Sequence, residues 1–219
     1  MPAEFGLEGL AAPGWLRDGR LVSDGDAGLR VWDLATGTSQ LLRACKKTLT
    51  TISLLVSPDS HLVLRLDAAV QTGYDSSLSV FDLASRVTRE ITSHGKSVLS
   101  FALDPSGTIL VTGDKSGVVR VGRLTGGESH LLFGHTGPVT SVAVSPDGRW
   151  IASGSDDGTI RLWPMPDMTK PPLHTLPYDE LMAKLKSLTN LRAVRDAASD
   201  TGWKIVIGPF PGWKDVPIW

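Results

Sequence analysis

Short stretches in which small polar and apolar residues alternate run through most of the chain, separated by turn residues. The clearest stretch is VTSVAV, and a period of two residues is typical of a strand with one buried face. The turn sequence SPDG comes after it, and further on the tight turn Asp156–Gly158. The strands of this segment are expected at 139–144, 150–153, 159–163 and 173–176. The segment therefore predicts a small antiparallel sheet.

The same pattern recurs along the chain at nearly constant intervals. SPDG at 145–148 is related to DPSG at 104–107, SPDS at 57–60 and LRDG at 16–19, at successive intervals of 41, 47 and 41 residues. Other landmarks move with these turns: Trp163 corresponds to Gly122, Phe81 and Trp32, and His135 to His94 and Lys47. Four short strands in a repeat of this length are the unit of a β-propeller blade. The blades are expected at about 3–42, 43–90, 91–131 and 132–177.

After Pro177 the periodicity changes, so we expect a second domain at 178–219. An amphipathic helix is predicted at 179–188, followed by two strands at 191–195 and 203–207 and by a segment rich in Pro and Trp. We interpret this α+β tail as a cap docked on the blades. The alternative is an exposed docking arm for a partner.

Composition and charge exclude several classes of function. The chain has 219 residues, 41% of them hydrophobic and 21% charged, which indicates a globular protein with a core of its own. The formal net charge is −1 and no run of Lys and Arg occurs, so nothing predicts a nucleic-acid or membrane partner. Cys45 is the single cysteine, which indicates a reducing compartment. We therefore expect a cytoplasmic protein.

The segment GHTGPVTSVAVSPDGRWIASGSDDGTIRLW at 134–163 resembles a WD40 repeat. The resemblance is close over this repeat, good over the third and degraded over the first two. It implies an all-β fold, a WD40-type β-propeller of about four blades in an open arc. The tail resembles the C-terminal ends of WD-repeat regions in large bacterial proteins, where the repeats often follow a Ser/Thr kinase domain.

The resemblance also implies a hydrogen-bonded chain of His, Ser or Thr, Asp and Trp inside each blade. In the last blade it places this chain on His135, Ser153, Asp157 and Trp163. The other blades keep part of it: His94 and Thr112 in the third, Asp75 in the second, and Asp26 and Trp32 in the first. A buried His and a buried Trp N–H both need partners, so such a chain stabilises the register of a blade. We expect the fourth blade to be the most rigid.

Several stretches suggest chemistry at first sight. Asp156 and Asp157 could be an acid–base or metal-binding pair, but adjacent residues in a tight turn diverge, and the repeat favours a turn. The stretch 24–28 lacks the later ligands of a calcium loop. Arg30, Arg120 and Arg161 recur at one strand position, and we expect their stems to be packed. The common phosphate-loop, zinc-protease and hydrolase motifs do not occur. We therefore predict no catalytic residue, metal site or cofactor.

The resemblance implies a partner-binding face at the start of each first strand and at the turn between the second and third strands. On this chain it consists of Tyr74, Lys115, Asp156, Ile52, Leu99 and Thr140. The alternative is that neighbouring loops cover these residues. The long connection Asp67–Asp75 in the second blade is expected to project as a recognition loop.

These features predict a non-catalytic scaffold for protein–protein interaction, with protein or peptide partners. One alternative is an accessory sensor region of a larger bacterial signalling enzyme. The third hypothesis is a propeller enzyme with an active site on its central axis. The sequence contains no set of acids or histidines from different blades that would meet at such a site.

Four blades are fewer than the seven or eight of a usual ring, so both ends of the arc need cover. The chain can belong to a longer protein, two copies can complete a ring of about eight blades, or the tail can cap one end. We favour an open, fragment-like propeller.

Overall fold

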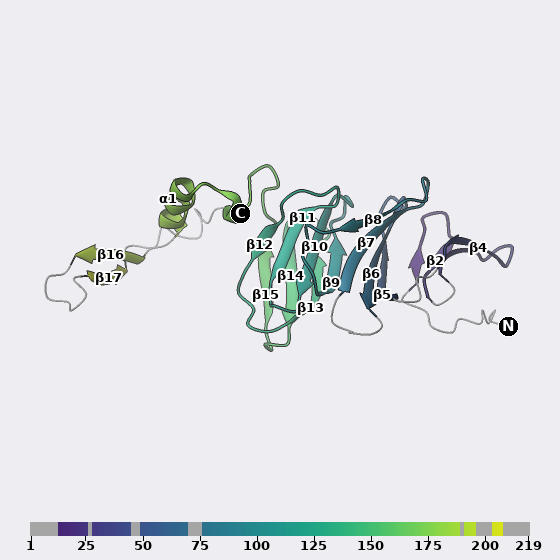
Figure 1. Ribbon diagram of the computed structural model, residues 1–219, viewed down its shortest axis with the longest axis horizontal. Coiled ribbons are helices and arrows are strands. Elements are labelled where there is room, and N and C mark those ends of the chain that lie inside the picture. Colours follow the sequence, from purple (N-terminus) through teal and green to yellow (C-terminus); the bar gives the residue numbers. More distant parts are fainter. Residues whose placement is uncertain are drawn as a thin grey trace. The chain divides into compact units, whose positions relative to one another are not determined.

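The computed structural model shown in Figure 1 describes residues 13–25, 28–44, 49–69, 76–188, 191–195 and 203–207. It contains four small antiparallel sheets in chain order, coloured from purple to green in Figure 1, followed by a short helix and a two-stranded hairpin. The predicted all-β fold of about four blades with a small α+β tail is confirmed. The chain divides into two compact units, Met1–Met165 and Pro166–Trp219, so the second unit begins before the boundary expected at 178.

The first three sheets have four strands each, and in each sheet sequential strands are neighbours. The first blade contains β1 (Gly14–Trp15), β2 (Leu21–Ser23), β3 (Leu29–Asp33) and β4 (Thr38–Arg43). The second contains β5 (Leu49–Val56), β6 (Leu62–Ala69), β7 (Ser76–Asp82) and β8 (Thr88–Ile91). The third contains β9 (Val98–Leu103), β10 (Ile109–Asp114), β11 (Val119–Arg123) and β12 (His130–Leu132).

Among the described residues the fourth blade has three strands, which are β13 (Val139–Val144), β14 (Trp150–Ser155) and β15 (Ile160–Pro164). The prediction of a fourth strand at 173–176 was wrong, because Leu173–Thr175 forms a 3₁₀ helix. The repeat interval of 41 residues carries β12 onto a segment that contains Pro171 and Pro172. Proline has no N–H to donate to a ladder, so this segment cannot form a regular strand.

Consecutive blades pack face to face through apolar residues of their middle strands. In β6, Val63 belongs to the cluster shared with the first blade, whereas Leu64 and Leu66 belong to the cluster shared with the third. Successive side chains of a strand point to opposite faces, so each middle strand contributes to two interfaces. The core is therefore a series of layers between blades.

The tail unit contains α1 (Tyr178–Leu188) and the antiparallel strands β16 (Leu191–Arg195) and β17 (Trp203–Ile207), as the sequence predicted. Asp179 and Glu180 lie in the first turn of α1, where negative charge is favourable. None of the helices in the described ranges has the length and apolar character that a membrane span requires.

Candidate interaction face and its supporting networks

The fourth blade brings together all four residues of the predicted polar chain. Nε2 of His135 lies 2.8 Å from Ser153 Oγ, and Nδ1 lies 2.8 Å from Asp157 Oδ2. Trp163 Nε1 donates to Ser153 Oγ over 2.8 Å. His135 and Ser153 are buried. One serine hydroxyl therefore links the histidine of the entry loop to the tryptophan of β15.

Asp157 ties the turn between β14 and β15 to the loop that enters β13. Its carboxylate accepts hydrogen bonds from Thr159 Oγ1 at 2.6 Å, from Thr159 N at 2.9 Å and from Thr136 N at 3.0 Å. The hydrogen bonds from Thr159, with those from His135 and Thr136, hold the pKa of Asp157 well below its usual range. Asp156 is exposed, so the two adjacent carboxylates point to different surroundings.

The third blade keeps the histidine and the threonine of the polar chain, and an aspartate two residues before the aligned position pairs with an arginine. His94 Nδ1 lies 3.0 Å from Thr112 Oγ1, as the resemblance implied. Ser116 occupies the aligned aspartate position, but Asp114 accepts hydrogen bonds from Ser116 N at 2.8 Å and pairs with Arg120. The sequence contained this signal, because an aspartate precedes the aligned position by two residues.

Gly122 replaces the tryptophan of the third blade because other side chains fill the space. A Cβ atom on Gly122 would lie 2.6 Å from Ser129 Oγ and 2.9 Å from His94 Nε2. Ser129 Oγ donates to the carbonyl of Ser93 over 2.9 Å. Burial, reinforced by the positive charge of Arg120, lowers the pKa of His94 to about 4. His94 is therefore neutral at pH 7.

The first two blades keep less of the polar chain. Trp32 Nε1 donates to Ser23 Oγ over 2.7 Å, which repeats the bond between Trp163 and Ser153. Asp26 and Asp75 lie outside the described residues.

In the second blade the position of Ser153 is taken by Arg65. Arg65 faces Ser79 across β6 and β7 as Ser153 faces Arg161 across β14 and β15. The offset that relates SPDS to SPDG also carries Ser153 onto Arg65. Sequence reasoning missed this residue although the signal was present.

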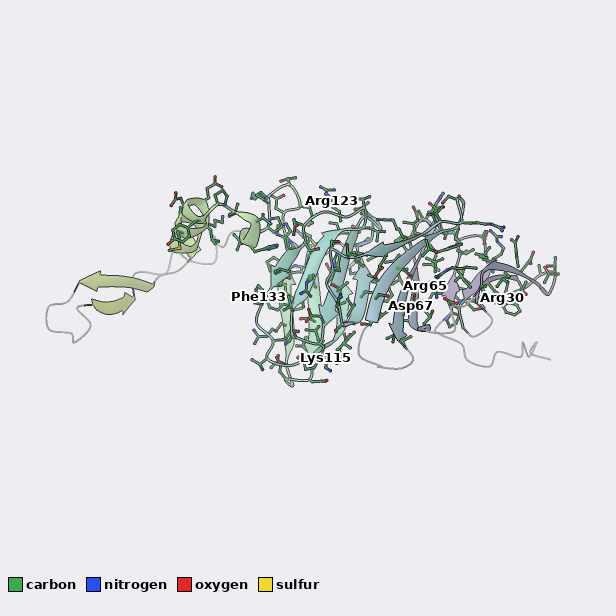
Figure 2. All side chains as sticks on the ribbon, in the orientation of Figure 1. Arg30, Arg65, Asp67, Lys115, Arg123 and Phe133 are labelled. Carbon is green, nitrogen blue, oxygen red and sulfur yellow. The ribbon has the colours of Figure 1, made fainter. Side chains whose placement is uncertain are left out.

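Arg65 is the centre of a buried charged network between the first and second blades. It pairs with Asp24 of the first blade and, through Nη2, with Asp67 Oδ1 at 3.1 Å. Arg65 Nη2 also donates to Thr51 Oγ1 over 2.7 Å, and that hydroxyl lies 2.7 Å from Asp67 Oδ1. All four side chains are buried. Figure 2 shows Arg65 and Asp67 close together.

The burial of Asp67 corrects the prediction of a projecting connection that begins at this residue. Strand β6 continues to Ala69, and Asp67 lies within it, held by Arg65. A residue whose side chain forms a buried ion pair cannot belong to a loop that projects into solvent. The rest of the connection, including Tyr74, lies outside the described residues.

Three predicted face residues occupy the same structural position, a β-bulge in the first strand of their blades. The ladder between the first and second strands skips Ile52 in β5, Leu99 in β9 and Thr140 in β13. Ile52 is 51% exposed and Leu99 38%, and Thr140 is exposed as well. A bulge re-aims side chains locally, and in the described part of the chain all three side chains reach solvent.

The turn residues of the predicted face are fixed beside the bulges. The backbone N–H of Lys115 donates to Ser97 O over 3.1 Å, and that of Asp156 donates to Pro138 O over 3.0 Å. Ser97 directly precedes β9 and Pro138 directly precedes β13. Each turn is therefore held against the start of the bulged strand of its own blade. Figure 2 shows Lys115 at the lower edge of the blades.

The comparison with protein families agrees with this architecture. Two segments of the chain match the WD domain, G-beta repeat family. They are residues 85–121 and 126–164. The second segment runs from β12 through β13 and β14 to β15, so one WD40 repeat combines the last strand of one blade with three strands of the next. No curated protein matches the chain.

A chain in a solved structure, "Crystal Structure of Mitotic Checkpoint Complex", is similar in fold. Its TM-score is 0.56 and its sequence identity 20%. The similarity covers 71% of this chain and 46% of that chain, so this chain spans less than half of that chain's length. At this identity the similarity concerns the fold alone. Together the two repeats and this fold support a WD40 propeller.

Ser153→Ala is expected to lower the free energy of unfolding by about 1–3 kcal/mol, because the buried His135 and the half-buried Trp163 each lose a hydrogen-bond partner. Urea denaturation followed by tryptophan fluorescence measures the change. Ser141→Ala is the matched control, since Ser141 is an exposed serine in the same blade. An equal loss in both variants would contradict a stabilising role of the polar chain.

Asp157→Ala should also destabilise the fourth blade, and its control is the exposed neighbour Asp156→Ala. Asp147 serves less well as a control. Its carboxylate accepts hydrogen bonds from Ser145 and Arg149, which lower its pKa to about 2.

Proposed function

We propose that the chain is a non-catalytic interaction scaffold that binds a protein or peptide across its bulge residues and the adjoining turns. The observation that supports this most strongly is the bulge repeated in three blades. The same backbone geometry presents Ile52, Leu99 and Thr140 to solvent. A recognition surface requires side chains of different chemistry at equivalent backbone positions, and the three bulges provide this arrangement.

The exposed chemistry favours a partner segment with apolar residues beside an acidic one. Ile52 and Leu99 offer apolar surface in neighbouring blades, and apolar anchors contribute much of the energy of an interface. Lys115, which is exposed in the turn next to β9, attracts a carboxylate. The row also contains Asp156 and the uncharged Thr140, so charge can discriminate between partners along it.

The arrangement of the histidines supports a non-catalytic role. His94 and His135 are both buried, and each contacts a hydroxyl group of its own blade. Neither belongs to the exposed row. The proposal includes a cytoplasmic location, which the single cysteine supports. A sensor region of a larger bacterial signalling enzyme is the alternative, and it would use the same face.

The double variant Leu99→Glu/Lys115→Glu should weaken partner binding at least tenfold, which is about 1.4 kcal/mol. Partners are recovered by affinity capture, and the dissociation constant of each is then measured by calorimetry. The control is Arg86→Glu/Val87→Glu, which changes the charge and an apolar side chain at exposed positions of the second blade. Equal affinities for wild type and the Leu99/Lys115 variant would overturn the assignment of the face.

A further inference from the structure

Two apolar positions recur in the third strand of every blade. They are Leu29 and Val31 in β3, Leu78 and Val80 in β7, Val119 and Val121 in β11, and Ile160 and Leu162 in β15. In the first three blades these side chains are at most 6% exposed. Ile160 is 80% exposed and Leu162 is 69% exposed. Equivalent residues of the same type thus have opposite surroundings.

In the first two blades the pairs are buried because the following blade covers them. Leu78 and Val80 pack in one cluster with Val98 and Leu110 of the third blade. The first blade's pair packs in the same way against Leu54 and Val63 of the second. In the described part of the chain no further blade follows β15, so the same surface remains open. An exposed apolar strip of this kind marks an interaction site.

The first blade carries the complementary half of such an interface. In the second blade, Val56 and Val63 face each other across β5 and β6 and pack toward the first blade. Their counterparts in the first blade are Trp15 and Leu21, which face each other across β1 and β2. Trp15 is 62% exposed. The first blade therefore has apolar side chains on the side where a preceding blade would pack.

We propose that a second copy of this chain covers the open face of the fourth blade with its own first blade. Ile160 and Leu162 of one copy then pack against the surface that contains Trp15 and Leu21 of the other. The contact repeats the interface that already joins successive blades within the chain. It is head-to-tail, and two such contacts close a ring of two copies with about eight blades.

Light scattering after size exclusion tests the inference on the full chain over a range of concentrations. Wild type should have the mass of two copies. Leu162→Lys and Trp15→Lys should each have the mass of one copy, because each places a charge in both contacts. Both side chains are largely exposed in the single chain, so circular dichroism should show intact blades. Val87→Lys, an exposed apolar residue away from both surfaces, should remain a pair of copies.

Three results would overturn the inference. Wild type could have the mass of one copy at every concentration, which would mean that the tail or another protein covers the face. Trp15→Lys could remain paired while Leu162→Lys dissociates, which would indicate contact between two fourth blades. Val87→Lys could dissociate as readily as the other two variants. The Leu99→Glu/Lys115→Glu variant should remain paired, so failure of the proposed partner face is distinguishable from failure of self-association.

Discussion

Arg65→Ala is expected to lower the free energy of unfolding by about 3–5 kcal/mol, the largest effect of any single substitution considered. Arg65 is buried and pairs with the buried carboxylates of Asp24 and Asp67. Removal of the guanidinium leaves two negative charges close together in the protein interior. The cost comes mainly from these uncompensated charges and not from the lost attraction itself.

Denaturant unfolding followed by circular dichroism measures the effect of Arg65→Ala. The matched control is Arg20→Ala, because Arg20 pairs with Asp18 at the surface and its loss should cost less than about 1 kcal/mol. Adding Asp24→Asn and Asp67→Asn to Arg65→Ala should recover part of the stability, since the two buried charges are removed. Equal losses for Arg65→Ala and Arg20→Ala would contradict the buried network.

The network also connects stability to the proposed binding face. Thr51, which contacts Arg65, is the last paired residue before the bulge at Ile52. Asp24 belongs to the first blade, and Arg65 and Thr51 to the second. The charges that join the two blades therefore also support the backbone that presents Ile52 to solvent.

The second large effect is a loss of stability as the pH falls from about 6.5 to about 4. Burial lowers the pKa of His94 in the folded protein to about 4, against 6.5 for an ordinary histidine. Between these values the unfolded chain binds a proton that the folded protein does not. The free energy of unfolding should therefore fall by about 3 kcal/mol over this range and be recovered as the pH rises.

Urea denaturation at a series of pH values measures this dependence. His94→Gln removes the titrating group, so its stability should change much less between pH 7 and pH 4, whatever its stability at neutral pH. His61→Gln is the control, since His61 is exposed, and its pH dependence should follow wild type. If the free energy of unfolding changed equally with pH in wild type and in His94→Gln, a buried neutral His94 would be ruled out. The pKa values of Asp147 and Asp167 are lowered to about 2, so these carboxyls contribute only at lower pH.

Much of the candidate site could be predicted where the repeat is intact. The fourth blade retains His, Ser, Asp and Trp at one spacing, and the structure brings these four side chains together. The third blade could be predicted only in part, because Ser116 stands at the aligned aspartate position and the aspartate of the same turn, Asp114, pairs with Arg120. Alignment by the repeat interval finds residues that occupy the same position in every repeat. It does not find residues that lie in the same turn at a different position.

The network of Arg65 could not be predicted from residue type. Position 65 could be located by the repeat, but nothing near it in the sequence identifies Asp24 as its partner. Ion pairs between blades depend on how two sheets face each other, and the two residues lie in different repeats. The absence of a strand at 173–176, in contrast, could have been predicted from the sequence. Pro171 and Pro172 cannot donate hydrogen bonds to a strand ladder.

The sequence by itself determined the blades, since alternation, turn residues and repeat spacing act over a few neighbouring residues. Only the tertiary structure decided which apolar side chains are covered. Val80, Val121 and Leu162 occupy the same place in their strands, yet the first two are buried and the third is exposed. The physical reason is that burial at these positions depends on the next blade, and a residue's own repeat contains no information about what packs against it.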